Sequence, residues 1–206
     1  MQERSMDTCR RLVSAAAELF DRKGYVNATL GEITGAARLT KGALYFHFAS
    51  KGELAHAVQT RGRVLLAESV DRIAAHNGSP LQTLIDFTHW LARGLREEAV
   101  LRANFRLSRE LRGEEAAGST DFYQAGMATA WSLLDRAEAA GELRDGVDRT
   151  GPQTLLAAAV AGIELLAATD MADEELAARV SALWDLALPG LVGPAGRTVF
   201  RTTTPS

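Results

Sequence analysis

Apolar side chains recur every three or four residues along almost the whole chain, the spacing that places them on one face of an α-helix. The first such stripe ends at Gly24, a residue type that commonly follows the end of a helix. Its members are Cys9, Leu12, Val13, Ala16, Leu19 and Phe20. The sequence has neither the alternating apolar pattern nor the β-branched enrichment of strands. The pattern therefore predicts an all-α protein whose first helix covers about residues 5–23.

Capping signals predict three further helices in the next part of the chain. Thr29 and the glutamate three residues later form a capping box, which begins a short helix over about 29–37. Thr40 is placed to cap another short helix, and a second capping box at Ser50 begins a longer helix that ends near residue 76. Helices shorter than ~12 residues are marginal alone, so we expect the two short ones to pack on the first helix.

Turns that contain glycine or proline divide the rest of the chain into further helices. These turns fall at 77–80, 112–115, 141–152 and 189–190. We expect helices over about 81–97, 100–111, 119–140, 152–169 and 173–188.

Length and composition fit a soluble globular protein of one or two domains, with 47% hydrophobic and 24% charged residues. We expect an N-terminal three-helix domain over 1–52, a second helical domain over 53–192 and a disordered tail over 193–206. The single cysteine, Cys9, excludes an intrachain disulfide. The sequence shows no apolar run of ~18 residues and no secretory signal, so we expect a cytoplasmic protein without a membrane segment.

Charge is divided unevenly along the chain. Residues 1–52 hold eight lysine or arginine residues against five acidic ones, a balance of +3. Because the whole chain carries −3, the remaining residues carry −6. A basic N-terminal part on an acidic remainder suggests that only the N-terminal part meets phosphate.

The helix that begins at Thr40 has one face for the core and one for a partner. Leu44 and Phe48 can pack against Ile33 and the first helix, which leaves the opposite face exposed. That face presents Lys41, Gly42, Ala43, Tyr45 and His47. Small and cationic side chains of this kind suit a DNA groove.

Each of these groups has a specific use at a DNA surface. Lys41 can reach a guanine or a phosphate, and Ala43 can touch a thymine methyl group. Tyr45 and His47 can donate to phosphates, and the helix N-termini at Thr40 and near Lys51 offer amides to anions. Lys41 can also be an ordinary solvated lysine, and His47 a surface histidine without a phosphate contact.

The run from Thr40 to Phe48, preceded by Gly24-Tyr25 and Thr29 and followed by Ser50-Lys51, resembles the DNA-binding domain of TetR-type repressors. The resemblance implies an all-helical homodimer with a C-terminal ligand-binding domain, whose repression is relieved by a small molecule. The residues expected at the DNA are Thr29, Arg38, Thr40, Lys41, Gly42, Ala43, Tyr45, His47 and Lys51.

Arg38 departs from the pattern of that family, which usually has glycine in the turn between the two short helices. A non-glycine residue held at positive φ costs ~1 kcal/mol. Either the turn has a different shape here, or Arg38 contacts a phosphate.

Aromatic residues concentrate between residues 81 and 140, where they are core side chains or the walls of an apolar ligand pocket. Ala130-Trp131, together with the form of the helix that begins at Thr40, is similar to the γ-butyrolactone-receptor branch of the family. That similarity implies a small lactone, butenolide or furan ligand lying against Trp131, which can otherwise be a core residue. The expected ligand residues are Trp131, Phe87, Thr88, Trp90, Phe105 and Gln124.

The last two predicted helices are rich in small and aliphatic residues and resemble the dimer seam of the family. Their apolar positions include Leu155, Leu156, Val160, Ile163, Leu166, Leu176, Val180, Leu183, Trp184 and Leu188. A two-fold seam sets the DNA-reading helices about one DNA turn apart, ~34 Å or a multiple, so we expect a pseudo-palindromic double-stranded operator. An internal hairpin core is the alternative for these positions.

The leading hypothesis is a repressor released by a γ-butyrolactone-like signal; the alternative is a TetR-type regulator of another apolar compound, such as an exported drug. An enzyme is disfavoured because Cys9 lies on a core stripe and the four histidines are scattered, without metal-ligand spacing. We therefore expect no cofactor and no metal. A non-specific architectural DNA binder is disfavoured by the acidic remainder of the chain.

Overall fold

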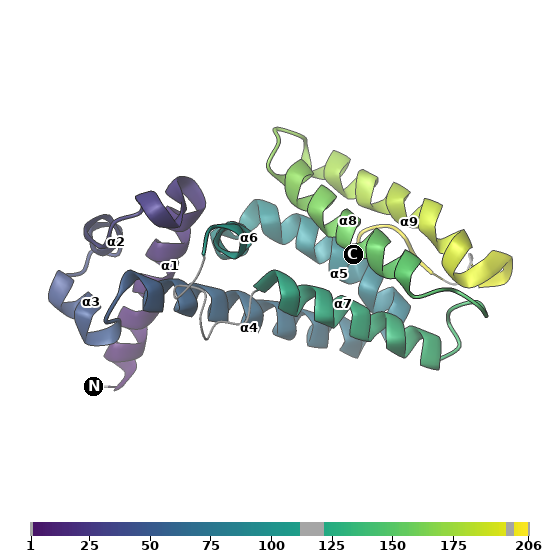
Figure 1. Cartoon of the computed structure of the whole chain (residues 1–206), viewed down its shortest axis with the longest axis horizontal. Helices are drawn as coiled ribbons and strands as arrows, with labels where there is room; N and C mark the ends of the chain where they lie inside the picture. The colour runs from purple at the N-terminus through teal and green to yellow at the C-terminus, as the bar shows by residue number, and fades with distance from the viewer. Residues whose placement is uncertain (1, 112–121, 197–199, 206) are drawn as a thin grey trace. The chain divides into compact units, whose positions relative to one another are not determined.

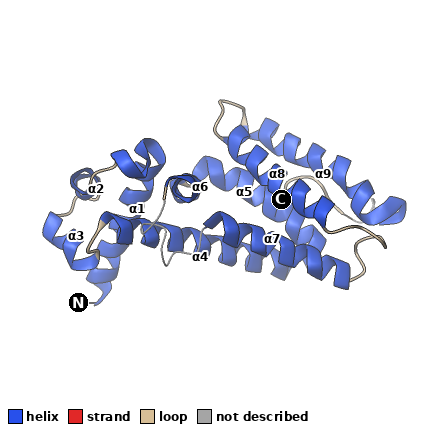
Figure 2. Cartoon of the chain, viewed as in Figure 1, coloured by secondary structure: helices blue, strands red, loops and turns tan. Residues whose placement is uncertain are grey.

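The computed structural model describes residues 2–111, 122–196 and 200–205. Within these ranges every regular element is an α-helix, which confirms the predicted all-α fold (Figures 1 and 2). The helices are α1 (Gln2–Asn27), α2 (Leu30–Ala36), α3 (Lys41–His47), α4 (Lys51–Asn77), α5 (Pro80–Glu97), α6 (Ala99–Glu110), α7 (Phe122–Ala139), α8 (Thr150–Ala167) and α9 (Asp173–Gly196). The predicted turn at 112–115 and the first residues of the helix predicted over 119–140 lie outside the described residues.

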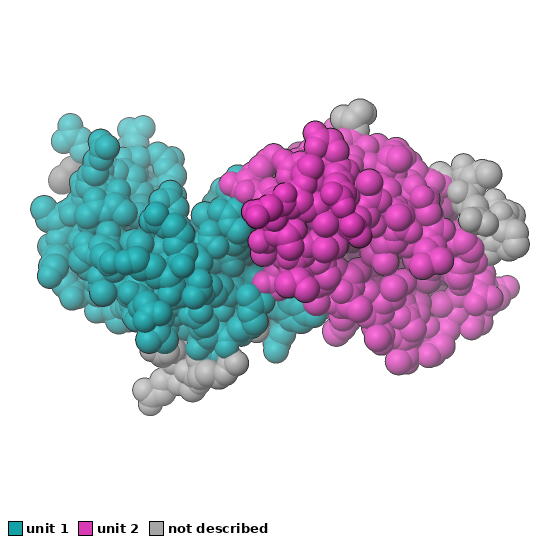
Figure 3. All heavy atoms as spheres, turned by 90° about the horizontal axis from the view of Figure 1, so that it is seen from above, with its two compact units in different colours: residues 1–65, 98–125 teal, residues 66–97, 126–206 magenta. Residues whose placement is uncertain are grey.

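Two compact units divide the chain, coloured separately in Figure 3. The first comprises residues 1–65 and 98–125, and the second comprises 66–97 and 126–206. This division differs from the predicted domains, because α6 packs on α1 although many residues separate the two helices in the sequence.

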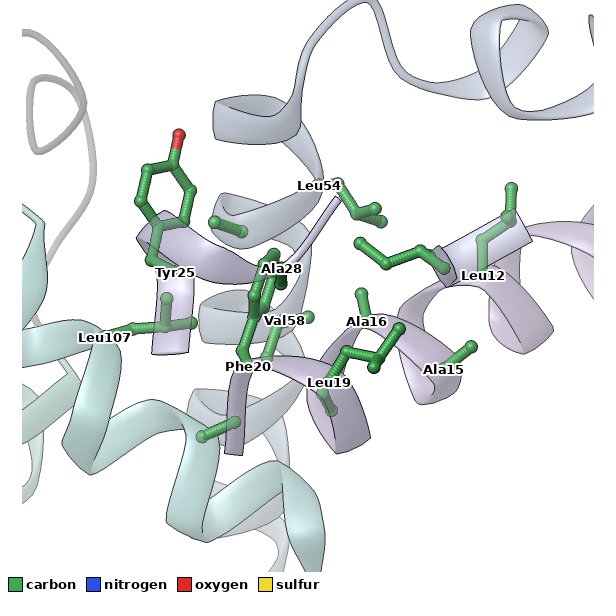
Figure 4. Packing of buried hydrophobic residues seen from close by; sticks show 14 of the residues in the cluster. Leu12, Ala15, Ala16, Leu19, Phe20, Tyr25, Ala28, Leu54, Val58 and Leu107 are labelled. Carbon is green, nitrogen blue, oxygen red and sulfur yellow. The ribbon is translucent and has the colours of Figure 1, made fainter. Parts of the chain in front are cut away.

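The core of the first unit forms where α1 meets α2, α3, α4 and α6 (Figure 4). Leu12 and Phe20 of α1 are fully buried, and the ring of Phe20 lies 5.7 Å from that of Tyr25. Leu44 and Phe48 are buried in the same cluster, so the short α2 and α3 are stabilised by packing on α1, as expected.

Gly24 interrupts α1 with φ 79° and ψ 169°, so the stop predicted at this residue falls on a real break. α6 lies against the break: the Glu110 carboxylate accepts a hydrogen bond from the Tyr25 amide at 2.5 Å. A Cβ built at Gly24 would lie 2.6 Å from the Arg106 guanidinium and 2.7 Å from the Glu110 carboxylate. The backbone conformation therefore favours glycine here, and any side chain at this position would also displace the ends of the Arg106 and Glu110 side chains.

In the second unit α8 and α9 pack against α5. The Trp184 indole donates to the Thr88 hydroxyl at 2.8 Å, and Trp184 and Val180 of α9 are buried. Most of the apolar positions predicted for a dimer seam are thus buried within this unit, as the hairpin alternative expects. Leu165 of α8 and Leu186 of α9 are instead 71% and 81% exposed.

The C-terminal part of the chain differs from the prediction in two respects. The helix expected to end at 188 continues through Pro189 to Gly196, because buried Leu188 and Leu191 hold the following turn against the unit. Residues 200–205, predicted to be disordered with the rest of 193–206, are hydrogen-bonded to α5.

One described helix, α8, is long and apolar enough by length and composition alone to cross a membrane. The sequence was predicted to contain no segment that is long and apolar enough to span a membrane, and α8 differs from that prediction. The same test is passed by core helices of soluble proteins, and several α8 side chains, Ile163 among them, are buried in the second unit.

Candidate nucleic-acid interface

The turn between α2 and α3 ends α2 with one residue in the left-handed backbone conformation. Arg38 has φ 53°, and it is the one non-glycine residue at positive φ in the described part of the chain. Its amide donates to the Gly35 carbonyl at 3.0 Å and the Leu39 amide to the Thr34 carbonyl at 2.9 Å, the two bonds of a Schellman motif. The turn therefore has the shape that glycine usually supplies, and of the two predictions for Arg38 the differently shaped turn is wrong.

Arg11 of α1 fixes this turn from outside. Its guanidinium donates to the Ala37 carbonyl at 2.7 Å and to the Arg38 carbonyl at 3.4 Å. These bonds pair carbonyls that the end of α2 leaves without helical partners. The turn is thus tied to α1, and the Arg38 side chain remains exposed.

Thr29 begins α2 with the predicted capping box. Its hydroxyl accepts from the Glu32 amide at 3.2 Å and donates to the Glu32 carboxylate at 2.8 Å. Bonds from Lys23 and then Thr29 lower the pKa of Glu32 from 4.5 to about 2. The Thr29 hydroxyl is engaged in this box, and the DNA contact expected of Thr29 stays a prediction.

Thr40 caps α3, accepting from the Ala43 amide at 3.1 Å. Leu44 points into the core and is fully buried, which fixes the rotation of α3 about its axis. The opposite face carries exposed Lys41 and Gly42, with Tyr45 at 58% exposure. The structure thus brings the predicted α3 residues together on one open surface, on which Ala43 and His47 are half-buried.

Phe46 also lies on the open side of α3, and sequence reasoning missed it. Its side chain is 80% exposed, and its ring lies edge-on to His47 with the centroids 5.1 Å apart. An apolar ring this exposed gains little from folding, so its position suits contact with a partner. The available signal was its place one residue after Tyr45 and two before buried Phe48, since a helix cannot bury every position of such a run.

Lys51 has a structural role, and the DNA contact predicted for it stays a prediction. Its ammonium donates to the carbonyls of Tyr25, Val26 and Ala28 at 2.8, 3.2 and 3.2 Å. It also lies 4.5 Å from the centre of the Tyr25 ring. With its donors directed at these carbonyls, Lys51 holds the start of α4 against the end of α1 and the residue that follows it.

The six predicted ligand residues are divided between the two units. Phe87 and Thr88 are buried in the second unit, where Thr88 bonds Trp184. Phe105 belongs to the first unit and packs edge-on against Phe122 at 5.4 Å. The remaining residues lie at or near the surface: Gln124 and Trp131 are exposed on α7 and Trp90 is half-buried on α5.

Three cavities are hollowed into the described part of the second unit. Their volumes are about 150, 340 and 240 Å³. The first lies among residues 134–153, and the other two lie beside α5. Trp90 lines the 340 Å³ cavity, whereas Trp131, the residue expected to lie against the ligand, lines none of these three.

Two short helices packed on a third across a left-handed turn, with one face of the last helix open, define a helix-turn-helix protein. Residues 12–58 match the family model described as bacterial regulatory proteins, tetR family.

Three relatives extend the match over nearly the whole chain. The A-factor receptor protein of Streptomyces griseus is 34% identical over 94% of this chain and 67% of its own length. A crystal structure of a γ-butyrolactone receptor (ArpA-like protein) has a TM-score of 0.75 at 28% identity, covering 95% of this chain and 93% of that one. CprB, a TetR family protein from Streptomyces coelicolor, in complex with its operator sequence, has a TM-score of 0.75 at 28% identity over 95% and 94%.

The chain belongs to the TetR family of bacterial regulatory proteins. The family resemblance expected from the run Thr40 to Phe48 is confirmed, as is the similarity to its γ-butyrolactone-receptor branch.

Proposed function

We propose that this protein is a transcriptional repressor that binds a pseudo-palindromic operator and is released from it by a small γ-butyrolactone, butenolide or furan. The observation that supports operator binding is the open face of α3. Lys41, Gly42 and Tyr45 are exposed on this face, and Leu44 is buried on the opposite one. Names of relatives support the second part: one is an A-factor receptor and another a γ-butyrolactone receptor.

Gly42 supports contact with a groove because the fold does not require it. A Cβ built there would lie 3.8 Å from the Thr40 hydroxyl, an ordinary contact, and nothing else lies nearer. Glycine inside a helix costs about 0.5–1 kcal/mol relative to alanine. Because Gly42 also lies on the exposed face of α3, its missing side chain supports a partner that approaches the backbone closely at this position.

The protein acts as a homodimer in this proposal. Leu165 and Leu186 leave large apolar side chains in water on α8 and α9, which a second copy would bury. Such a face also explains why α8 is apolar without crossing a membrane. Because the target is chromosomal DNA, we place the dimer in the cytoplasm.

Trp131 is the ligand contact we propose on α7. It is 38% exposed, and aromatic side chains of this size are more often buried, so its exposure supports contact with a ligand or with a segment that closes over it. The relatives favour this ligand class over an exported drug, and they are receptors and regulators, not enzymes.

The proposal is tested by selecting bound fragments from genomic DNA and footprinting the dimer on them. We expect a pseudo-palindrome whose half-sites lie about 34 Å or a multiple apart, and release by members of a panel of small lactones, butenolides and furans. Trp131→Ala should bind the same operator but resist release, and Trp131→Phe should retain part of the response. Unchanged release from Trp131→Ala would refute the ligand contact; equal affinity for random duplexes at the same salt would refute operator binding.

A further inference from the structure

α5 carries a polar stripe although most of its surface is buried. Gln82, Asp86, His89 and Arg93 follow one another at steps of four, three and four residues, which places them on one face of the helix. Asp86 and His89 are both more than nine-tenths buried. Buried polar groups of this kind require partners, because desolvation without hydrogen bonds is costly.

Residues 201–204, here called the C-terminal strap, supply those partners. The Gln82 side chain accepts from the Arg201 amide and donates to the Arg201 carbonyl, both at 2.9 Å. The Arg201 guanidinium pairs with the buried Asp86 carboxylate at 2.8 Å. Figure 1 shows this end of the chain, in yellow, running beside α5.

His89 fixes the far part of the strap. Its Nε2 lies 2.7 Å from the Thr202 carbonyl, which can only accept, so Nε2 carries the hydrogen. Its Nδ1 lies 3.4 Å from the Thr204 hydroxyl, and burial lowers the pKa of the ring, which favours this neutral tautomer. The side chain of Arg93, the next residue of the stripe, has no hydrogen bond or ion pair within the described residues.

The strap forms one wall of the 340 Å³ cavity. The opposite walls come from α4, with Arg72 and Ile73, and from α5, with Trp90 and Arg93. Like Arg93, the Arg72 side chain has no partner among the described residues. The Trp90 ring is held flat by stacking on Phe87, with centroids 5.4 Å apart and planes at 19°.

The charge around this cavity is one-sided. Asp86 is the single carboxylate among its described walls, and Arg201 already pairs with it. Among the described residues no carboxylate forms an ion pair with the guanidinium of Arg72 or Arg93, although Arg93 also borders the 240 Å³ cavity, which has three acidic residues in its wall. Guanidinium groups bind carboxylates with short, charge-assisted hydrogen bonds.

We propose that this cavity binds a small organic carboxylate with a flat apolar body. Its carboxylate lies at Arg72 and Arg93, its body lies on Trp90 and Ile73, and the C-terminal strap closes the remaining side. The site selects an anion, so it is distinct from a pocket for a neutral lactone, and it does not depend on the proposed response to lactones.

Benzoate is a suitable probe, with benzamide as its uncharged counterpart of the same shape. Calorimetric titration of the 206-residue protein should show benzoate binding. Benzamide should bind about tenfold more weakly or worse, because it cannot form charge-assisted hydrogen bonds between a carboxylate and the two guanidinium groups. Arg72→Gln and Arg93→Gln should each weaken benzoate binding to a similar degree. Arg136→Gln, which removes an exposed arginine of α7 away from the cavity, is the matched control and should bind as the unmodified protein does.

Substitutions in the C-terminal strap provide a second, independent test of the site. Arg201→Ala should weaken benzoate binding, because it leaves the Asp86 carboxylate unpaired beside the cavity. Adding Asp86→Asn to that variant should restore part of the affinity, which a purely structural effect of losing the strap would not do. Thermal melting of each variant reports whether it is folded.

Three outcomes would overturn the proposal: no benzoate binding, equal binding of benzamide, or equal weakening in Arg136→Gln and Arg93→Gln. Titration is done without DNA, so its result stands apart from operator release. Loss of lactone response with retained benzoate binding would refute the proposed function alone, and the reverse would refute this site alone.

Discussion

Two lysines near the helix-turn-helix have different environments and should behave differently when replaced. Lys51→Met removes three hydrogen bonds to carbonyls at the end of α1, so the free energy of unfolding should fall by about 1–3 kcal/mol. Lys41→Met alters an exposed side chain and should change stability by less than about 0.5 kcal/mol. Urea unfolding measures both.

Operator affinity should change in the opposite way: the Lys41 variant should be affected and the Lys51 variant should not. Lys41→Met should lower affinity and reduce the slope of affinity against salt by about 1, as expected when one phosphate contact is lost. At a temperature where Lys51→Met is folded, its salt slope should match that of the unmodified protein. If the folded Lys51→Met variant showed a reduced slope of affinity against salt, Lys51 would contact a phosphate, which would contradict a purely structural role.

Gly42→Ala should stabilise the protein and weaken its operator binding. Alanine favours the helix by about 0.5–1 kcal/mol, and the space around Gly42 accepts a Cβ. We expect affinity to fall about tenfold, about 1.4 kcal/mol, because the methyl group keeps the α3 backbone from the groove. Gly35→Ala on α2, which has no neighbour within 4 Å, is the matched control: it should be stabilised equally and bind normally. Unchanged affinity of Gly42→Ala would argue against close approach at this position.

At the scale of single elements, the capping box of α2 makes the stability of the helix-turn-helix depend on acid pH. The pKa of Glu32 lies near 2 in the folded protein and near 4.5 without its partners, so its contribution is complete above pH 4.5 and is lost as pH falls toward 2. The unmodified protein should therefore have a higher urea midpoint than Glu32→Gln at pH 6. The difference should shrink between pH 4.5 and pH 3, and a constant difference would show that the carboxylate is not stabilised by folding.

The ends of a helix could be predicted from the sequence where the residues that determine them are close together in the chain. Thr29 and Thr40 bond amides three residues away, so the starts of α2 and α3 are visible in the sequence. Pro189 is a local stop signal too, but burial of Leu188 and Leu191 outweighs it, so α9 continues.

Contacts between distant residues are the ones that sequence patterns did not reveal. Glu110 meets the Tyr25 amide across 85 positions, and Arg201 meets Asp86 across 115. No periodicity links such pairs, which is why the C-terminal residues were predicted to be disordered and α6 was predicted to belong with the rest of the body. The open face of α3 was predictable because one short helix contains both its buried and its exposed residues.

At the scale of the whole molecule, the exposed leucines of α8 and α9 provide a test of the dimer. Leu165→Glu and Leu186→Glu place charges in the proposed dimer seam. Burial of each leucine side chain there would stabilise the dimer by about 1.5–3 kcal/mol per copy. Sedimentation should show each variant dissociating at concentrations about a hundredfold higher than the unmodified dimer. Val64→Glu, an equal change at an exposed position of α4, should remain dimeric. A dimer that tolerates both leucine variants would place the seam elsewhere.

The contact between α6 and the break in α1 has a consequence for engineering this protein. A hybrid regulator that takes only residues 1–65 would leave the Tyr25 amide without the Glu110 carboxylate and the Asp21 carbonyl without the Arg106 guanidinium. The piece to be transplanted is discontinuous: residues 98–125 have to accompany 1–65, so a functional graft needs three crossover points, after residues 65, 97 and 125, instead of one.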